Sequence, residues 1–408
     1  MDADKLTSII IAGGGLVGSL TALLLARRRS DLSICIVEPN ADGPVDDKRT
    51  IALAAATVEL LQQHGIWPDL AAESEAIKHI HVSDRGYLGA TRLHAEDEGV
   101  TALGQVVPAA ALNRALYQHL ADLPNVLWRG GTQVTAVAQH SDSAQVTVAP
   151  VVDAAGKGEG EGEGEQLRCQ LLIGADGQRS FVRQALGITM QVTDYQQVGI
   201  IATVELAESL KGWAYERFTE TGPVALLPLP NRQASLVWSV AADEADKTLA
   251  LSDADFLRDL QEVFGYRAGR LVGIGERLQF PLQLHLAERS VAHRAVIIGN
   301  ASHTLHPIAG QGFNLGVRDA ISLSDQLARA SDPGAYATLA DYWQQRKEDY
   351  RQIIGLTDLL VRGFSNHHWP MNKLRNLALL GLDALPLVRN SFARQTMGLS
   401  HLAKGERR

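Results

Sequence analysis

The opening residues alternate apolar runs with polar breaks in an order that predicts strand, turn, helix and strand. Residues 7–12 (TSIIIA) form a near-continuous apolar run, which is typical of a buried parallel strand. Residues 20–28 (LTALLLARR) predict a helix with one buried side, and residues 32–38 (LSICIVE) predict a second strand. The glycines of residues 13–18 (GGGLVG) supply the turn after the first strand.

Weaker patterns of both periods follow along the chain. Residues 48–70 predict a loop that enters a helix, and residues 79–93 predict two short strands joined by a glycine-containing turn. Residues 104–120 predict a strand followed by a helix, and residues 125–173 predict a series of short strands.

The second half of the chain first favours strands and then helices. Residues 194–281 predict long antiparallel strands interrupted by one helix at 253–266, and the pattern from residue 335 onward is mostly helical. Residues 156–165 (GKGEGEGEGE) contain no apolar side chain, so we expect a flexible loop between two strands.

The composition limits the class of protein. With 408 residues the chain is long enough for two or three structural units, and 46% apolar with 21% charged residues is an ordinary globular balance. A formal net charge of -8 argues against nucleic-acid binding. From Arg346 onward 11 Lys and Arg face 5 Asp and Glu, a net of +6, so the remainder carries about -14.

The two cysteines, Cys35 and Cys169, form no disulfide framework and no metal-ligand spacing. They favour a reducing, cytoplasmic compartment. We see neither a signal peptide nor an apolar run of membrane-spanning length. The spacing of His303 and His306 lacks a third ligand, so we expect no metal.

Three glycine-rich segments carry the candidate chemistry, and the first is the turn at residues 13–18. Gly13, Gly15 and Gly18 have the G-x-G-x-x-G spacing, and Glu38 ends the second strand. In a dinucleotide-binding unit these glycines make the turn, admit the pyrophosphate and let helix and strand pack, while the acid binds ribose hydroxyls. The alternative for Glu38 taken alone is a solvated strand-end carboxylate.

The second segment is residues 299–319, which follow the apolar run 295–298. Glycines at such a strand-to-helix junction let the backbone approach a flat ligand and leave N–H groups at the helix start. From His306 to Asp319 the sequence reads H-P-x-A-G-Q-G-x-N-x-G-x-x-D. This pattern resembles the second flavin fingerprint of the FAD-dependent aromatic hydroxylases, in the branch that hydroxylates ubiquinone precursors.

The third segment, residues 174–183 (G-A-D-G-x-R-S-x-x-R), resembles the third fingerprint of the same family. Strings such as ERFTETGPVALLPLP look most like the 2-polyprenyl-6-methoxyphenol hydroxylases. One departure is Asn300, where the family usually has Asp, so the contact with the ribityl chain is expected to be weaker.

Arg114 lies on a predicted helix and faces either the cofactor or solvent. The resemblance implies cofactor contacts from Gly13, Gly15, Gly18, Glu38, Arg49, Gln105, Asp176, Asn300, Gly310, Gly312, Phe313 and Asn314.

The family resemblance also implies the architecture. We expect an α/β protein with a Rossmann-like FAD-binding domain, an antiparallel-sheet substrate domain and C-terminal helices. The FAD-binding domain would be discontinuous, and the substrate domain would be formed by two insertions. The expected division is 1–78, 100–190 and 282–345 for FAD, 79–99 and 191–281 for the substrate, and 346–408 for the helical region.

The implied activity is ring hydroxylation of a polyprenylated phenol in ubiquinone biosynthesis. NAD(P)H reduces FAD, O2 adds to the flavin C4a carbon, and the hydroperoxide transfers one oxygen to the phenol. His306 is a weak candidate base, and the carbonyl of Pro307 is expected to face the ring or the substrate. The expected walls of the substrate chamber are Tyr215, Phe218, Leu226, Leu227 and Trp238, with ordinary core packing as the alternative for each.

Two other functions stay open. The protein could be a related flavin reductase or oxidase that acts on a lipid, or a flavin-binding assembly subunit without turnover, which Asn300 and the basic C-terminal helices make conceivable. Those helices also allow contact with other ubiquinone-biosynthesis proteins or a peripheral contact with the inner membrane, although a helical cap on the cofactor domain is the simpler interpretation.

Overall fold

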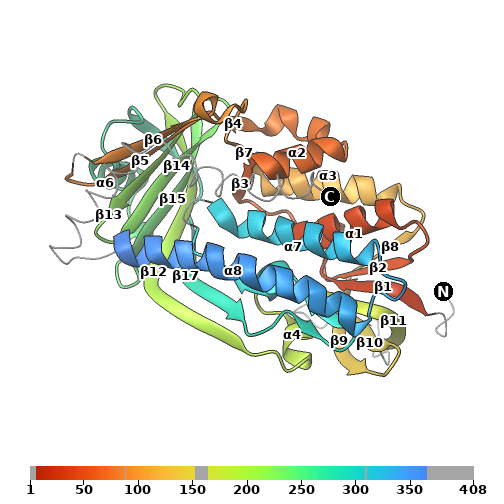
Figure 1. Cartoon of the computed structure of the whole chain (residues 1–408). Coiled ribbons are helices and arrows are strands. Elements are labelled where there is room, and N and C mark those ends of the chain that lie inside the picture. Colours follow the sequence, from red (N-terminus) through yellow and green to blue (C-terminus); the bar gives the residue numbers. More distant parts are fainter. Residues whose placement is uncertain (1–5, 88, 152–163, 308–309, 365–408) are drawn as a thin grey trace.

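The structure is a computed structural model that describes residues 6–87, 89–151, 164–307 and 310–364. Its first sheet lies at the right of Figure 1 and has a parallel centre in the order β19-β11-β1-β2-β8. The bounds of these strands are β1 (Thr7–Ala12), β2 (Ile34–Glu38), β8 (Val126–Gly130), β11 (Glu165–Gly174) and β19 (Ala295–Ile297). Antiparallel strands extend this sheet: β9 (Thr132–Gln139), β10 (Ala144–Pro150) and β18 (Val291–Ala292).

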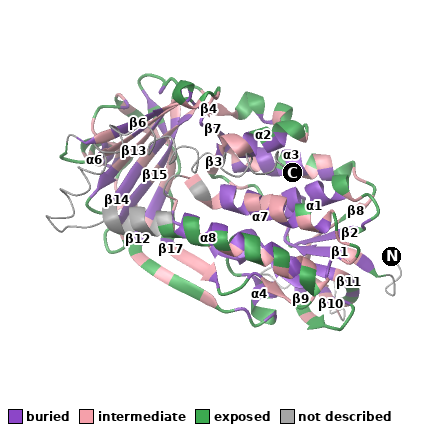
Figure 2. Ribbon diagram, viewed as in Figure 1, coloured by how far each residue is buried: buried purple, intermediate pink, exposed green. Residues whose placement is uncertain are grey.

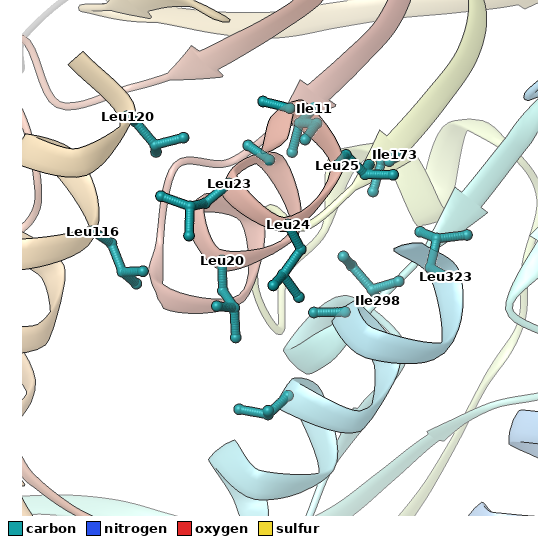
Figure 3. Packing of buried hydrophobic residues seen from close by; sticks show 14 of the residues in the cluster. Ile11, Leu20, Leu23, Leu24, Leu25, Leu116, Leu120, Ile173, Ile298 and Leu323 are labelled. Carbon is teal, nitrogen blue, oxygen red and sulfur yellow. The ribbon is translucent and has the colours of Figure 1, made fainter. Parts of the chain in front are cut away.

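Both faces of the first sheet are covered, as the continuous apolar run of β1 requires. Ile9 and Ile11 pack into a core with the helices, whereas Ile10 and Ala12 pack into a second core with β9 and β10. Figure 3 shows leucines of α1 between side chains of α3 and α7. The helices are α1 (Leu16–Arg28), α2 (Ala55–Gln63), α3 (Ala109–Ala121), α4 (Phe181–Ala185), α7 (Gln311–Leu327) and α8 (Tyr336–Phe364).

The second sheet, at the left of Figure 1, has the order β20-β17-β12-β15-β14-β13-β5-β6, and β16 (Leu271–Ile274) pairs with β12. Most neighbours are antiparallel, but β13 and β5 run parallel. The strands are β5 (His79–Asp84), β6 (Ala90–His94), β12 (Met190–Leu206), β13 (Trp213–Thr219), β14 (Gly222–Leu229), β15 (Gln233–Ala241), β17 (Leu278–Ala287) and β20 (His303–Thr304).

Shorter elements complete the described chain. A three-stranded sheet has the order β3-β7-β4. Its strands are β3 (Thr50–Ala54), β4 (Glu75–Ile77) and β7 (Gly104–Pro108). The remaining helices are α5 (Ala245–Leu249), α6 (Asp253–Phe264) and the 3-10 turns η1 (Trp67–Asp69), η2 (Ala71–Glu73), η3 (Glu96–Glu98) and η4 (Gly299–Ala301).

The two faces of the second sheet have different environments. Residues directly opposite on paired strands point to the same face, and neighbours along a strand alternate. The row Val224, Trp238 and Ile200 is buried against α6, where the rings of Trp238 and Phe256 lie 5.3 Å apart. The other face is turned toward the three-stranded sheet, because the Ser235 hydroxyl on that face bonds Thr50 of β3. Figure 2 shows many buried residues on strands β13 to β15.

Most elements follow the sequence pattern. The first strand, helix and strand, the hairpin at 79–93 and the helix near 253–266 are confirmed. The prediction of a loop before α2 was wrong in part, because Thr50–Ala54 is a strand that runs directly into the helix. No turn residue in the sequence marks the boundary between the two elements. The α/β class with two sheets and a C-terminal helix is also confirmed.

Several predicted segments fall at the limits of what is described. Residues 156–163 of the expected loop and residues 365–408 of the expected helical region lie outside the described residues. Glu165, which we placed in that loop, instead begins β11 and forms an ion pair with Arg129. No helix in the described part of the chain is long and apolar enough to cross a membrane. The division into FAD and substrate domains stays a prediction.

Candidate functional site

Of the three fingerprint glycines at the turn between β1 and α1, one is at an open position and two are at closed ones. A Cβ on Gly13, whose φ is +100°, would lie 2.4 Å from the Ala175 carbonyl oxygen, and one on Gly18 would lie 2.0 Å from the Gly13 oxygen. A Cβ on Gly15 would meet nothing within 4 Å. Gly15 caps α1 without a side-chain hydrogen bond. The helix start therefore presents backbone N–H groups to open space, as an anionic phosphate requires.

Glu38 lies at the end of β2, directly beside this turn. Its carboxylate is 6% exposed, and its two oxygens accept the backbone N–H groups of Gly14 at 2.7 Å and Asn40 at 3.0 Å. Each oxygen has a second lone pair. Glu38 therefore holds the glycine turn in place and keeps acceptor capacity for ribose hydroxyls.

Asp176 follows β11 and lies against the same turn. The Ala175 N–H donates to the Ala12 carbonyl at 2.7 Å, which brings the first and third glycine segments together. The Asp176 carboxylate accepts the Ser180 hydroxyl at 2.5 Å and the Val182 N–H at 3.0 Å. Asp176 thus supports the start of α4, whose N-cap is Ser180; the Ser180 hydroxyl accepts the Arg183 N–H at 2.9 Å.

The second fingerprint runs from η4 to the start of α7. Gly299 has a φ of +57° and Gly310, the residue before α7, a φ of +61°. Gly310 makes no side-chain cap, and a Cβ on Gly312 would meet nothing within 4 Å. Asn300 is exposed on η4, and Phe313 is half-buried against the core of α1. Among the described residues nothing therefore covers the Gly312 position, and the first backbone N–H groups of α7 have no partner within the helix.

The side-chain amide of Asn314 is held by the protein itself. Its Oδ1 accepts from the Ala54 N–H and the Thr57 hydroxyl, both at 2.9 Å. Its Nδ2 donates to the Ala52 and Gly310 carbonyls, also at 2.9 Å. These four bonds use the whole capacity of the side-chain amide. The amide therefore joins α7 to β3 and α2, and does not offer a free polar atom to a ligand.

Three further predicted positions lie on the neighbouring elements. Arg49 precedes β3, and its guanidinium pairs with the Asp47 carboxylate at 2.6 Å while its side chain is 55% exposed. Gln105 is half-buried at the centre of the small sheet, between β3 and β4. Arg114 forms an ion pair with Glu73 at 2.9 Å on the surface, so its charge has a partner within the protein.

His306, the weak candidate base, is fully buried. Its Nε2 lies 3.3 Å from the Gln197 oxygen, and its ring meets Tyr195 edge-on at 5.6 Å. Burial lowers the pKa of His306 to about 4, so the ring is neutral near pH 7. A group with that pKa is a weak acceptor for a phenol proton. The Pro307 carbonyl accepts the Gly310 N–H at 3.0 Å and closes the turn before α7.

The five predicted chamber residues divide between the two faces of the second sheet. Phe218 and Leu227 lie on the face turned toward β3. Tyr215, Leu226 and Trp238 instead lie on the face that α6 covers, where they form core. Core packing was the alternative kept for each of these residues. Strands 213–219 and 222–229 carry apolar residues on both faces, so the sequence pattern alone does not orient them.

A half-exposed apolar row lies on the opposite face of the second sheet. It crosses four neighbouring strands on the face turned toward β3, where paired residues lie side by side. Each member is only partly covered, in contrast to the buried row on the opposite face. The row consists of Ala225, Val237, Ile201 and Leu278.

Sequence reasoning also missed Gln197 and Asp319 as site residues. Gln197 follows a bulge in β12 at which Gln196 has a φ of +56°, a device that re-aims a side chain. Asp319 is the last residue of the second fingerprint, and no role could be assigned to it from the sequence. In the structure its carboxylate bonds Gly299 and His303. In the described parts of the chain no three His, Cys, Asp or Glu residues gather as metal ligands.

These residues fit a dinucleotide with a flat ring. Two helix starts, at Gly15 and Gly310, present backbone N–H groups, and two glycine positions leave space that a Cβ would fill. The buried carboxylate of Glu38 lies beside the first helix start. Together they can hold a phosphate, a ribose and an electron-rich ring edge by backbone contacts.

Comparisons with known proteins agree with this geometry. A family model described as FAD binding domain matches residues 6–357. Ubiquinone hydroxylase UbiL of Rhodospirillum rubrum is 34% identical over 97% of this chain and 90% of its own. The 3-demethoxyubiquinol 3-hydroxylase of Escherichia coli is 30% identical over 96% and 99%. The crystal structure of p-nitrophenol 4-monooxygenase PnpA from Pseudomonas putida has a TM-score of 0.78 at 18% identity and covers 96% of this chain and 98% of its own.

The stability of the fold is expected to fall as the pH drops. Burial lowers the pKa values of His306 and His81 from 6.5 to about 4, so the unfolded chain binds protons that the folded chain excludes. Stability is then present near pH 7 and declines toward pH 4, by about 2 kcal/mol per histidine between about pH 7 and about pH 5.

Urea unfolding at these two pH values measures the effect. His306→Gln, which cannot titrate, should lose less stability than the unmodified protein over the same interval. An equal loss in both proteins would show that His306 is not excluded from protonation.

Proposed function

Because this chain belongs to the family described as FAD binding domain, we propose that it is an FAD-dependent monooxygenase that hydroxylates the aromatic ring of a polyprenylated phenol in ubiquinone biosynthesis. The electron donor is NAD(P)H and the oxidant is O2. One oxygen atom enters the ring as a hydroxyl group, the other leaves as water, and NAD(P)H supplies the two electrons. The observation that carries the proposal is the meeting of three glycine segments at two uncapped helix starts.

Bound FAD would accept the electrons and activate O2, which amino-acid side chains cannot do. The backbone N–H groups at the start of α1 would hold the pyrophosphate, and Glu38 would bind the ribose. The start of α7 would stabilise negative charge on the reduced ring through its N–H groups and dipole. Arg49 and Gln105 lie on or beside the small sheet next to α2 and are proposed as further contacts.

The substrate chamber is proposed between the second sheet and the start of α7. The partly exposed row Ala225, Val237, Ile201 and Leu278 lies on that side, together with Leu227. An apolar wall suits a polyprenyl tail and excludes water from the reacting centre. Gln197 lies on the same face and its oxygen bonds buried His306, so this pair is the proposed polar edge of the chamber.

The relatives support the substrate class and leave its details to experiment. The two bacterial relatives are a ubiquinone hydroxylase and a 3-demethoxyubiquinol 3-hydroxylase, so a ubiquinone precursor is the proposed substrate here. Contact with other ubiquinone-biosynthesis proteins and a peripheral contact with the inner membrane are proposed from the basic composition after residue 346.

Turnover with labelled oxygen tests the function. The protein loaded with FAD should oxidise NAD(P)H faster when a polyprenylated phenol is added, and 18O2 should leave one labelled atom in the hydroxylated product. Stimulated oxidation without label in the product would indicate a reductase or oxidase. No stimulation by any such phenol would favour a subunit without turnover.

The chamber wall makes a separate prediction. Ile201→Asn places a polar group in the apolar row, so water should reach the activated oxygen and release it as hydrogen peroxide. The peroxide formed per NAD(P)H oxidised is expected to rise roughly twofold or more. Val192→Asn on the same strand, where the side chain is 53% exposed, is the matched control. An equal peroxide yield in both variants would place the chamber elsewhere.

A further inference from the structure

A buried carboxylate joins the second fingerprint to the long helix α8. Asp319 lies in α7 and is 0% exposed. Its Oδ2 accepts the Gly299 N–H at 3.0 Å and lies 2.7 Å from His303 Nε2. Its Oδ1 accepts Nε of Arg346 and the hydroxyl of Tyr350, each at 2.8 Å. Four donors from three segments therefore meet on one carboxylate.

The group carries its charge in spite of its burial. Burial by itself raises the pKa of the Asp319 carboxyl, but His303, Arg346 and the Gly299 N–H outweigh it and lower that pKa below its usual value. Burial opposes the charge of Arg346 too, but Asp319 and its other partners raise the pKa of that guanidinium. Two arginines, Arg318 and Arg346, face the two carboxylates of Asp319 and Asp349.

This network ends at the turn that carries Asn300. Gly299, the residue before Asn300, is fixed by Asp319, and the Ala301 carbonyl after it accepts from buried Arg183 at 3.2 Å. A Cβ on Gly299 would lie 3.1 Å from Val17 of α1, so the turn is also pressed against the first glycine segment. Asn300 is therefore held between two buried charged side chains, and a shift of either one would move it.

The partners of Asp319 do not come from the fingerprint alone. Arg346 and Tyr350 lie on α8, and the Arg346 guanidinium stacks 4.9 Å from the Tyr350 ring. The Tyr350 ring also meets His303 at 4.8 Å. A displacement of α8 would therefore move the turn as well, because the buried polar groups that join them have no alternative partners.

We propose that Asp319, Arg346 and Tyr350 are positioning residues of the cofactor site, which tie α8 to the Gly299–Ala301 turn and place a balanced pair of buried charges beside it. This rests on the proposed FAD site. None of the three is a catalytic residue, since each acts through the turn or through its charge. The network makes the affinity for FAD and the reduction potential of the bound flavin depend on α8.

Two opposite neutralisations separate this role from simple packing. Asp319→Asn leaves the positive charge of Arg346 in excess, which should stabilise the reduced anionic flavin and move its midpoint potential to a more positive value. Arg346→Gln leaves the negative charge in excess and should move the potential the other way. Both variants break the same ion pair and both lower thermal stability, so a packing role alone predicts no such opposition.

The experiment measures the Kd for FAD, the midpoint potential and the melting temperature of the full chain. Tyr350→Phe, which removes one hydroxyl and no volume, keeps the test valid if a charge variant does not fold. We expect it to weaken FAD binding about threefold, and Asp319→Asn to weaken it about tenfold or more, where tenfold is about 1.4 kcal/mol.

Asp332→Asn is the matched control. Asp332 lies in the loop between α7 and α8, and its substitution breaks the ion pair with Arg294 but does not touch the Gly299–Ala301 turn. It should lower the melting temperature and leave the Kd and the potential unchanged. If the Asp319 and Tyr350 variants behave like this control, the network is structural and the proposal is wrong. If the unmodified protein binds no FAD, the proposed function itself fails.

Discussion

The close approach of backbone segments at three turns is the constraint on which the site depends. Gly18 lies against the Gly13 carbonyl, Gly13 lies against Ala175, and a Cβ on Gly316 would come within 2.7 Å of Val17. Side chains at these positions would separate β1, α1, β11 and α7. With the segments pressed together, Gly15 and Gly312 are left facing open space, so the ligand surface consists of backbone N–H groups.

The two faces of the second sheet have different roles: one is turned toward β3 and the glycine turns, and the other packs into the protein core. Its α6 side holds Trp238 and Leu226 in a dry core, while its opposite side carries the partly exposed row through Ile201 and Val237. Because the same strands do both, the proposed chamber wall has a packed layer behind it. The Thr50–Ser235 hydrogen bond and the contact of His306 with Gln197 join this wall to the cofactor segments.

The parts of this architecture that could be predicted are those that local sequence determines. Glycines at this spacing between an apolar strand and a helix specify a tight turn by themselves. The turn at Gly13, Gly15 and Gly18 could therefore be predicted from local sequence, without knowledge of its contacts in the fold. The facing of Leu226 and Leu227 could not be predicted, because adjacent apolar residues point to opposite faces and only strand register decides between them. The bonds from Arg346 and Tyr350 to Asp319 span 27 and 31 residues and leave no periodic signal.

The most direct test of the account is a titration of the purified chain with FAD, followed by the quenching of flavin fluorescence and by visible absorption. The account predicts saturation at one FAD per chain, and a loss of binding in Gly18→Ala, whose Cβ would meet the Gly13 oxygen at 2.0 Å. A protein that stays colourless and leaves the fluorescence of added FAD unchanged would contradict it.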